Sequence, residues 1–298
     1  MNQGLSDAQV QSVLAAKDGS VWLGTFGGLN RWHNGQITTY DNRGGKLDGL
    51  APNSLFQDGL GRIWISTNRE FGYLENNRFV PIKGVPGGPV HGIAEDPAGN
   101  LWVANQEFGL LRVVRGTMVQ QLPWARLGRK DLATALAADP LQGGLWIGFY
   151  LGGVTYFVDG QVRASYSVSD GVGKGRVAGL RLDKDGVLWV ASEGGLSRLK
   201  NGRIATLTSR NGLPCDAVHW AMEDDAHSVW LSMACGLVRI ARSELDLWAA
   251  AVDKNRDPKR VIHGTVFDNS DGVRIHANPG GYTPQVAKAL DGTYGSRT

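Results

Sequence analysis

The sequence has little of several features that mark common classes of protein. Among its 298 residues are only two cysteines, and no apolar run reaches the 18 or so residues that a membrane-spanning helix needs. A signal peptide, a histidine-kinase motif, a Gly-x-Ser-x-Gly elbow, a phosphate-binding loop and a paired-carboxylate motif are also missing. The last three of these absences lead us to expect no catalytic residues and no enzyme activity in this chain.

Charge and histidine content exclude two further kinds of site. The formal net charge is only +3, and no basic cluster alternates with aromatic residues, which argues against nucleic-acid binding. The six histidines lack the spacing of metal ligands; they are His33, His91, His219, His227, His263 and His276. The sequence thus predicts no metal, no cofactor and no nucleic-acid partner.

What the sequence does contain is a repeat. Stretches similar to "DGSVWLGTFGGLNRW" recur with a tryptophan at the same place, and these residues are Trp22, Trp64, Trp102, Trp146, Trp189 and Trp230. Their successive separations are 42, 38, 44, 43 and 41 residues, and the chain holds 42 glycines to supply tight turns. A period of about 40 residues with these features indicates four-stranded β-propeller blades.

The repeat defines the predicted architecture. We expect an all-β propeller of four-stranded antiparallel blades in one domain, residues 1–298, with the tryptophans packed between neighbouring blades. Six complete blades start near residues 4, 48, 88, 131, 175 and 215. A partial seventh covers 282–298, with a first strand near 284–289 and then the Asp291-Gly292 turn. Its missing strands come from the N-terminus or are lost to truncation.

One segment of the sixth repeat breaks the β pattern. Residues 243–258 are predicted to form a short helix between the third and last strands of that blade. Ser243 is the expected N-cap, Glu244 and Asp246 lie in the first turn, and Asp257-Pro258 ends the helix. The insert either packs on the rim or offers a docking surface to a neighbouring domain.

The two cysteines fall on one end of the sixth blade. Cys215 precedes its first strand and Cys235 follows its second, and antiparallel pairing brings these two points together. Two alternatives remain open here: a disulfide, which would indicate an oxidising compartment, or two buried free thiols.

The repeats resemble those of the two-component regulator propeller family. Trp22-Leu23-Gly24-Thr25, Gly28-Leu29-Asn30-Arg31 and Gly212-Leu213-Pro214 match its motif, and the similarity extends over residues 4 to about 292. The resemblance implies the periplasmic or extracytoplasmic sensor domain of a membrane-anchored receptor, often a histidine kinase. It also implies a small polar ligand such as a carbohydrate, and as partners the adjacent domains of the parent receptor and a second copy in a homodimer.

By analogy with other propellers, a ligand would bind at one end of the central channel. We expect the loops between blades to contribute Asn53, His91, Arg176, Asp216 and His219. The loops between second and third strands add Arg69, Glu70, Gln106, Glu107, Tyr150 and Glu193. The predicted ligand site comprises eight of these residues: Asn53, Arg69, His91, Glu107, Tyr150, Arg176, Glu193 and His219.

Two alternative functions compete with ligand sensing. A propeller can be a scaffold that binds only other proteins, which would predict an exposed patch on one face. The segment "PVHGIAED" also resembles streptogramin-type lyases, in which His91 and His219 could serve as bases. The repeats, however, carry Gly-Leu-x-Arg where those enzymes usually repeat Ile-Gly-Arg.

Overall fold

The computed structural model describes residues 4–41, 51–254, 260–273, 282–288 and 294–296. The chain divides into two compact units, which are described separately. Unit one comprises residues 1–143 and 280–298, and unit two comprises residues 144–279. Among the described residues, no helix is both long and apolar enough to cross a membrane.

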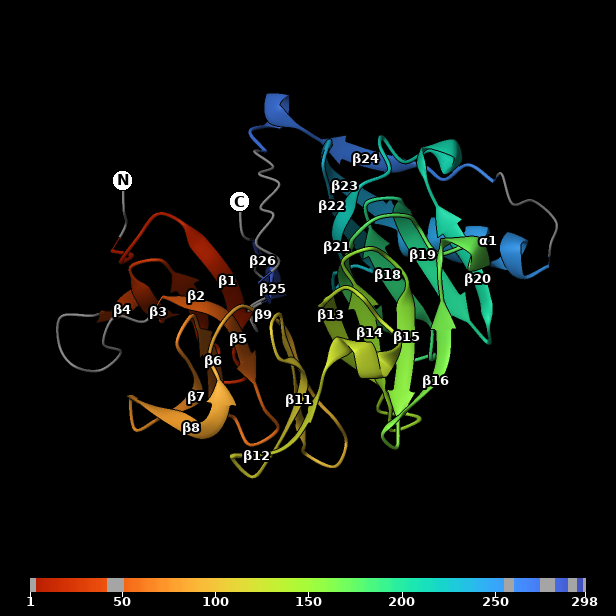
Figure 1. The fold of residues 1–298 in the computed structure, drawn as a ribbon. Helices are drawn as coiled ribbons and strands as arrows, with labels where there is room; N and C mark the ends of the chain where they lie inside the picture. The colour runs from red at the N-terminus through yellow and green to blue at the C-terminus, as the bar shows by residue number, and fades with distance from the viewer. Residues whose placement is uncertain (1–3, 42–50, 255–259, 274–281, 289–293, 297–298) are drawn as a thin grey trace. The chain divides into compact units, whose positions relative to one another are not determined.

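Unit one contains three four-stranded antiparallel sheets (Figure 1). The first has β1 (Val10–Ala15), β2 (Val21–Thr25), β3 (Gly28–His33) and β4 (Gln36–Asp41). The second has β5 (Pro52–Gln57), β6 (Ile63–Thr67), β7 (Glu70–Glu75) and β8 (Arg78–Pro86). The third has β9 (Val90–Glu95), β10 (Leu101–Asn105), β11 (Gly109–Val114) and β12 (Thr117–Leu122), followed by a short helix, η1 (Trp124–Leu127).

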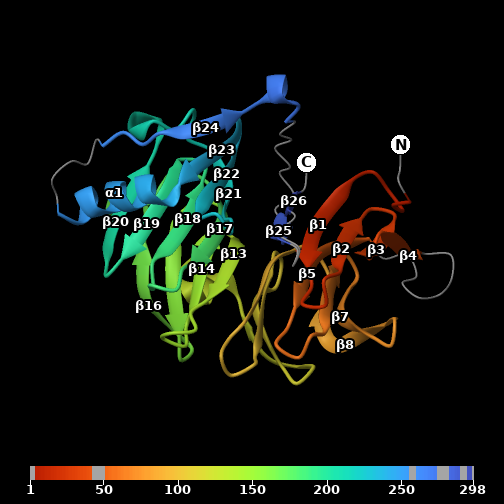
Figure 2. The same cartoon turned by 180° about the vertical axis from the view of Figure 1, so that it is seen from behind.

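The strands of unit two continue the same plan (Figure 2). The fourth sheet has the order β13 (Ala133–Ala138), β14 (Leu145–Phe149), β15 (Val154–Val158) and β16 (Gln161–Tyr166), and of these four strands β13 falls within the residues of unit one. The fifth has β17 (Val177–Leu182), β18 (Leu188–Ser192), β19 (Gly195–Lys200) and β20 (Arg203–Leu207). The sixth has β21 (Val218–Glu223), β22 (Ser228–Met233), β23 (Gly236–Ala241) and β24 (Gly264–Phe267). Single-turn helices η2 (Val168–Asp170), η3 (Ser209–Asn211) and η4 (Asn269–Asp271) follow the last strands.

In every sheet the strands pair in chain order, as expected for consecutive hairpins. The prediction of six four-stranded antiparallel blades is therefore confirmed. The truncated seventh blade is not: β25 (Val286–Lys288) and β26 (Tyr294–Ser296) form a separate two-stranded sheet. The predicted Asp291-Gly292 turn lies outside the described residues.

The hydrophobic cores lie between successive sheets. Trp22 packs in one core with Leu55 and Ile65 of the second blade, and Trp64 packs in the next core with Val90 of the third. In unit two, Trp189 shares a core with Leu231 of the sixth blade. These contacts agree with the inter-blade role predicted for the tryptophans. Burial of such large rings contributes apolar area that holds neighbouring blades together.

The predicted helix is present, with different ends. Helix α1 (Arg242–Asp253) begins immediately after β23, so Ala241 occupies the N-cap position and no side chain caps the helix. Ser243 as N-cap was wrong, because the strand runs directly into the helix and places Ser243 inside the first turn. The helix ends at Asp253, whose carboxylate receives two hydrogen bonds from Arg198, at 2.9 and 3.0 Å. The predicted end at Asp257-Pro258 falls outside the described residues.

Candidate functional site

A β-bulge recurs near the start of the first strand in five blades. In β1 the pairing with β2 shifts between Val10 and Ser12, which leaves Gln11 without an opposite residue. The same one-residue shift sets apart the second residue of β5, β9, β17 and β21; these residues are Asn53, His91, Ala178 and His219. Bulges redirect a side chain away from the regular alternation of a strand and are frequent next to binding sites.

Three predicted site residues therefore lie at bulges in strands rather than in loops. Asn53, His91 and His219 were expected in the loops between blades, but each is the second residue of a first strand. That expectation was wrong because the polar residue interrupts the apolar pattern and so resembles the end of a loop. The bulge is the physical reason that a polar residue can occupy this place in a buried strand.

In unit one the bulges form a row of three polar residues, which we call the polar row: Gln11, Asn53 and His91. They are all buried, with 4%, 3% and 7% of their surfaces exposed. The side chain of Asn53 accepts from the Ser54 backbone N–H at 2.8 Å and donates to Asn68 Oδ1 at 3.3 Å. His91 Nε2 donates to the Gln106 side-chain oxygen at 2.9 Å. Buried polar groups that are hydrogen-bonded in this way hold a fixed geometry.

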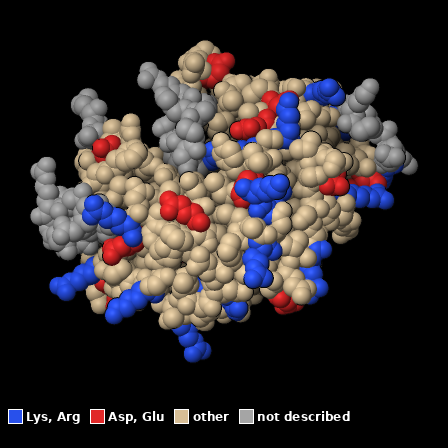
Figure 3. All heavy atoms as spheres, in the orientation of Figure 1, with Lys and Arg blue, Asp and Glu red and all other residues tan. Residues whose placement is uncertain are grey.

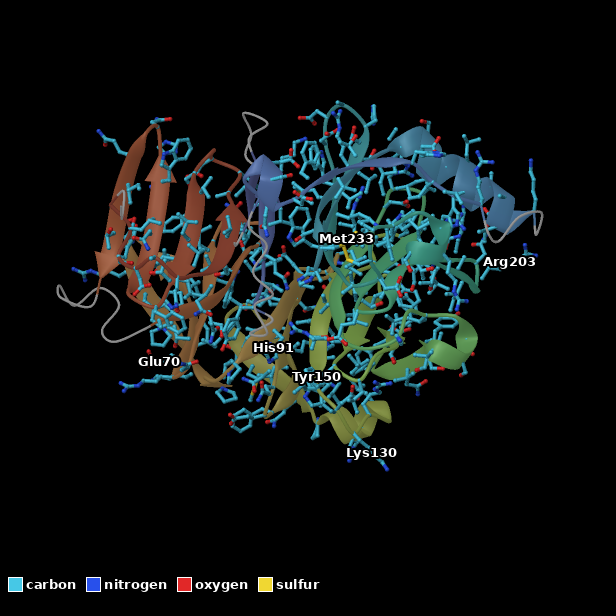
Figure 4. The ribbon with its side chains drawn as sticks, turned by 90° about the horizontal axis from the view of Figure 1, so that it is seen from above. Glu70, His91, Lys130, Tyr150, Arg203 and Met233 are labelled. Atoms are coloured by element: carbon cyan, nitrogen blue, oxygen red, sulfur yellow. A yellow bond between two sulfur atoms is a disulfide. The ribbon has the colours of Figure 1, made fainter. Side chains whose placement is uncertain are left out.

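The other predicted residues of unit one are more exposed to solvent than the polar row. Arg69 and Glu107 are exposed and lie in the loops that follow β6 and β10. The backbone N–H of Glu107 donates to Asn105 Oδ1 at 3.0 Å, and that of Arg69 donates to Thr67 Oγ1 at 3.2 Å. Glu70 was predicted in the same loop, but it is the first residue of β7. Figure 4 shows Glu70 and His91 among the side chains of this unit.

Unit two brings three predicted residues together, which we call the loop cluster: Tyr150, Arg176 and Glu193. Tyr150 follows β14, Arg176 precedes β17 and Glu193 follows β18. Burial lowers the pKa of the half-buried Arg176 guanidinium, whereas the nearby Glu193 and Tyr150 act to raise it. Tyr150 is 51% exposed and is labelled in Figure 4. The cluster thus combines a partly desolvated cation, a carboxylate and an accessible aromatic ring.

Glycine makes the close approach of these loops possible. Gly175 has φ +74°, and the position that a Cβ would take there coincides with the side chain of Glu193. A Cβ on Gly194 would likewise meet the backbone of Lys174. Any side chain at Gly175 would therefore displace Glu193 from its place beside Arg176.

The rim of unit two carries further charge. The Asp216 carboxylate accepts from the Ser209 backbone N–H at 2.8 Å, and Ser209, Lys174 and Arg210 hold the pKa of Asp216 below its ordinary value. His219 is half-buried at the bulge of β21. The face shown in Figure 3 carries Lys and Arg interspersed with Asp and Glu. Within the described part of the chain, no group of three or more His, Cys, Asp or Glu side chains could hold a metal ion.

Cys215 and Cys235 are joined by a disulfide in the sixth blade. Cys215 lies before β21 and Cys235 lies between β22 and β23, with 6.2 Å between their Cα atoms. The Ala234 backbone N–H donates to the Ala217 carbonyl at 3.1 Å, so backbone and side chains both close this end of the blade.

One member of the polar row, Gln11, and one residue that contacts the row, Tyr282, were not predicted from the sequence. Gln11 is at the bulge of β1 and is equivalent to Asn53 and His91. The signal in the sequence was its place as a polar second residue of an apolar first strand, directly after Val10. Tyr282 stacks on His91, with ring centroids 5.9 Å apart and planes 8° from parallel. Because residues 282–298 were predicted to form a partial blade, no contact between Tyr282 and His91 was predicted. No local pattern in the sequence indicates this contact.

A match to a family model agrees with the resemblance seen in the repeats. Residues 84–107 match the model of the family described as "Two component regulator propeller". This segment runs from the end of β8 to the loop after β10 and includes His91 and Glu107. The predicted recognition of the repeat is thereby confirmed. A comparison with curated proteins finds no match.

Several solved structures share the fold. One is an extracellular domain assigned to a hybrid two-component system of B. thetaiotaomicron, with a TM-score of 0.68 and 20% identity; the match covers 92% of this chain. This chain spans 36% of that domain. A streptogramin B lyase has a TM-score of 0.67 and 15% identity, and the match covers 99% of this chain and 92% of the lyase.

A third structure is PorZ, a surface component of the type-IX secretion system of Porphyromonas gingivalis. Its TM-score is 0.60 at 17% identity, and the match covers 78% of this chain and 40% of PorZ. At these identities the likeness concerns the fold alone.

Proposed function

We propose that this chain, which carries the two-component regulator propeller repeat, is the extracytoplasmic ligand-sensing part of a membrane-anchored signalling receptor. A histidine kinase is the expected output of the parent receptor, and this chain itself is expected to have no catalytic activity. The observation that carries the proposal is the repeat itself, which recurs six times and matches the family model at residues 84–107.

Two structural observations support an extracytoplasmic location. The similar extracellular domain from B. thetaiotaomicron is about three times longer than the segment matched here, as expected if propellers of this type form part of larger receptors. The Cys215–Cys235 disulfide also suits the periplasm or another oxidising compartment, where disulfides persist.

The loop cluster suggests which ligands to test first. A partly buried guanidinium beside a carboxylate can donate to and accept from the hydroxyl groups of a sugar, and it can pair with a ligand carboxylate. The half-exposed ring of Tyr150, followed by the 69% exposed Leu151, offers an apolar surface for one face of a sugar ring. We therefore propose a small polar ligand, with carbohydrates and uronic acids as the leading class.

A thermal-shift screen of the purified chain against oligosaccharides, uronic acids and small carboxylates tests this proposal. A ligand present at 100 times its dissociation constant adds about 2.7 kcal/mol to the free energy of unfolding. We expect Arg176→Gln and Glu193→Gln to abolish the shift. Arg163→Gln, at an exposed position of β16 in the same unit, is the matched control and should keep it.

The outcomes separate sensing from a scaffold role. A saturable shift that depends on Arg176 supports a sensor, whose neighbouring domains in the receptor would read the bound state. If no compound shifts the melting temperature of the wild type or of any variant, the result would contradict direct sensing and favour a scaffold that binds other proteins.

A structural observation favours the lyase alternative: the match to the streptogramin B lyase covers nearly the full length of both chains. Its candidate bases, His91 and His219, lie in different units and are both at bulges. Incubation with a type B streptogramin, followed by chromatographic separation and fragmentation by tandem mass spectrometry, tests it, because an elimination within one ring leaves the molecular mass unchanged. Ring opening that is lost in His91→Ala or His219→Ala would establish a lyase, and an unchanged antibiotic is the result that we expect.

A further inference from the structure

A segment near the end of the chain lies across the polar row of unit one. The Val13 backbone N–H donates to the Pro284 carbonyl at 2.9 Å, and the Leu55 N–H donates to the Thr283 carbonyl at 2.8 Å. Val13 and Leu55 belong to β1 and β5, the first strands of their sheets, which have one edge without a partner strand in the same sheet. The segment therefore fills part of two strand edges, as an added peptide does in β-augmentation.

The same segment is tied to the third blade. The Thr283 N–H donates to Ser54 Oγ at 3.0 Å, and the Ser54 hydroxyl donates to the Val90 carbonyl at 2.6 Å. The next residue after Val90 is His91, on whose ring Tyr282 stacks. Residues 282–284 thus contact the first strands of the three blades, at His91 itself and within two residues of Gln11 and Asn53. Figures 1 and 2 show β25, which follows this segment, beside β1 in both views.

We propose that residues 282–284 are a displaceable strap, an internal peptide ligand that covers the polar row and must leave His91 before an outside ligand can bind there. The strap itself is inferred from contacts within unit one. Its competition with a ligand rests on the proposed sensor function and concerns a second ligand site, at the polar row, in addition to the loop cluster. Displacement would move residues 282–284 together with the strand that follows them, β25. Binding of a ligand at the polar row would therefore change the position of β25.

The contacts suit reversible attachment. Among its contacts are two backbone hydrogen bonds, one bond to a hydroxyl and one ring stack, and each such contact is individually weak in water. Tyr282 is half-buried, as expected for a ring that rests on the surface of His91 rather than in a core. A segment held in this way opens locally without unfolding of the blades.

Tyr282→Ala tests the strap directly and needs no ligand. The loss of the ring stack is expected to raise amide hydrogen exchange at Val13 and Leu55 together by about tenfold. Modification of His91 by diethyl pyrocarbonate, followed by mass spectrometry, should accelerate in parallel. Tyr282→Phe keeps the ring and should stay within about twofold of the wild type. Phe26→Ala, which removes an exposed ring elsewhere in unit one, should leave all three rates unchanged.

Two results would overturn the proposal. Equal rates in Tyr282→Ala and the wild type would mean that the stack does not hold the segment. Exchange at Val13 and Leu55 only through global unfolding would mean that the segment is a fixed part of the core. Neither result depends on the ligand screen, so failure of the strap and failure of the sensor function can be told apart.

Discussion

The six blades differ in how they satisfy the indole N–H of the repeated tryptophan. In the second, third, fifth and sixth blades an aspartate six residues earlier accepts this hydrogen. The pairs are Trp64 with Asp58 at 2.8 Å, Trp102 with Asp96 at 2.9 Å, Trp189 with Asp183 at 3.2 Å, and Trp230 with Asp224 at 2.8 Å. In the first and fourth blades, Nε1 of Trp22 and of Trp146 is buried without a hydrogen-bond partner in the described part of the chain.

Each exception has a local cause. The first blade has Ala16 six residues before Trp22, although the turn there has the same backbone bonds as the turn at Asp58. In the fourth blade Asp139 is seven residues before Trp146, and its carboxylate accepts from the backbone of Leu141 and Gln142 instead. One substitution and one extra residue are thus enough to remove the bond.

The comparison teaches which part of the repeat is indispensable. Every blade keeps a bulky residue on the third strand opposite the tryptophan: Arg31, Tyr73, Arg112, Tyr156, Arg198 and Arg239. Three of these arginines stack over the indole, with centroid distances of 5.4 to 5.7 Å. The blade therefore forms with or without the aspartate, which adds stability to a packing arrangement that exists already.

The largest expected effect comes from removing the aspartate where the bond is best formed. Asp58→Ala leaves the fully buried Trp64 N–H without an acceptor and removes the carboxylate that pairs with Arg62. The free energy of unfolding should therefore fall by about 3 kcal/mol. Asp139→Ala, the matched change in a blade without the bond, should cost only about 1 kcal/mol. Urea unfolding of both variants checks this, and equal losses would refute the distinction between the blades.

Acid should act on the same bonds. Burial acts to raise the pKa of Asp58, but hydrogen bonds from Trp64 and Arg62 outweigh it and hold the pKa below the ordinary 3.8. Asp96 and Asp224 are lowered for similar reasons. A folded-state pKa below the unfolded value gives stability that is complete above about pH 4 and is lost as the pH falls through the folded value.

Urea midpoints measured near neutral pH, at about pH 5 and at about pH 3 test this dependence. The wild type should change little between the first two and fall at the third. Asp58→Ala should show a smaller fall than the wild type. An equal fall in both proteins would show that Asp58 does not contribute.

Restoring the bond in the first blade should stabilise the protein. Ala16→Asp places a carboxylate in the position equivalent to Asp58, where it can accept from Trp22 Nε1. We expect a gain of about 1 kcal/mol, or about 2 °C in melting temperature. A lower melting temperature would mean that the buried surroundings of Ala16 cannot accept the larger side chain.

The smallest effect concerns the residue opposite the tryptophan. Arg112→Met keeps an apolar stem over Trp102 but removes the cation, which should cost about 0.5 kcal/mol. The melting temperature measured at low and high salt checks this estimate. A loss comparable to that of Asp58→Ala would show that the cation, rather than the packing, is the common requirement of the repeat.

The sequence predicts the blades well because their determinants are local and repeated. A tryptophan, a turn and a third strand with a glycine at or near its start occur together six times, and four of the six copies carry Gly-Leu-x-Arg, so each copy supports the others. The helix between β23 and β24 was also predicted from the sequence. Its start was misplaced because the strand before it continues directly into the helix and leaves Ser243 inside the first turn.

The candidate site was less predictable, for two physical reasons. A bulge is a shift of one residue in register, and Asn53, His91 and His219 carry no composition signal that separates a bulge from a loop. The strap depends on contacts between distant residues, such as Thr283 with Ser54, which are 229 residues apart. The loop positions of Tyr150, Arg176 and Glu193 were predicted, but the glycine that lets Glu193 approach Arg176 is seen only in the structure.

The central claim, that the chain senses a small polar ligand through the loop cluster, is tested most directly by calorimetric titration. The strongest compound from the thermal screen is titrated into the wild type, Arg176→Gln and the Arg163→Gln control. We predict saturable binding to the wild type and the control, with affinity at least about tenfold weaker in Arg176→Gln because a charge-assisted contact is lost. Equal affinity in all three proteins would contradict a binding site at the loop cluster.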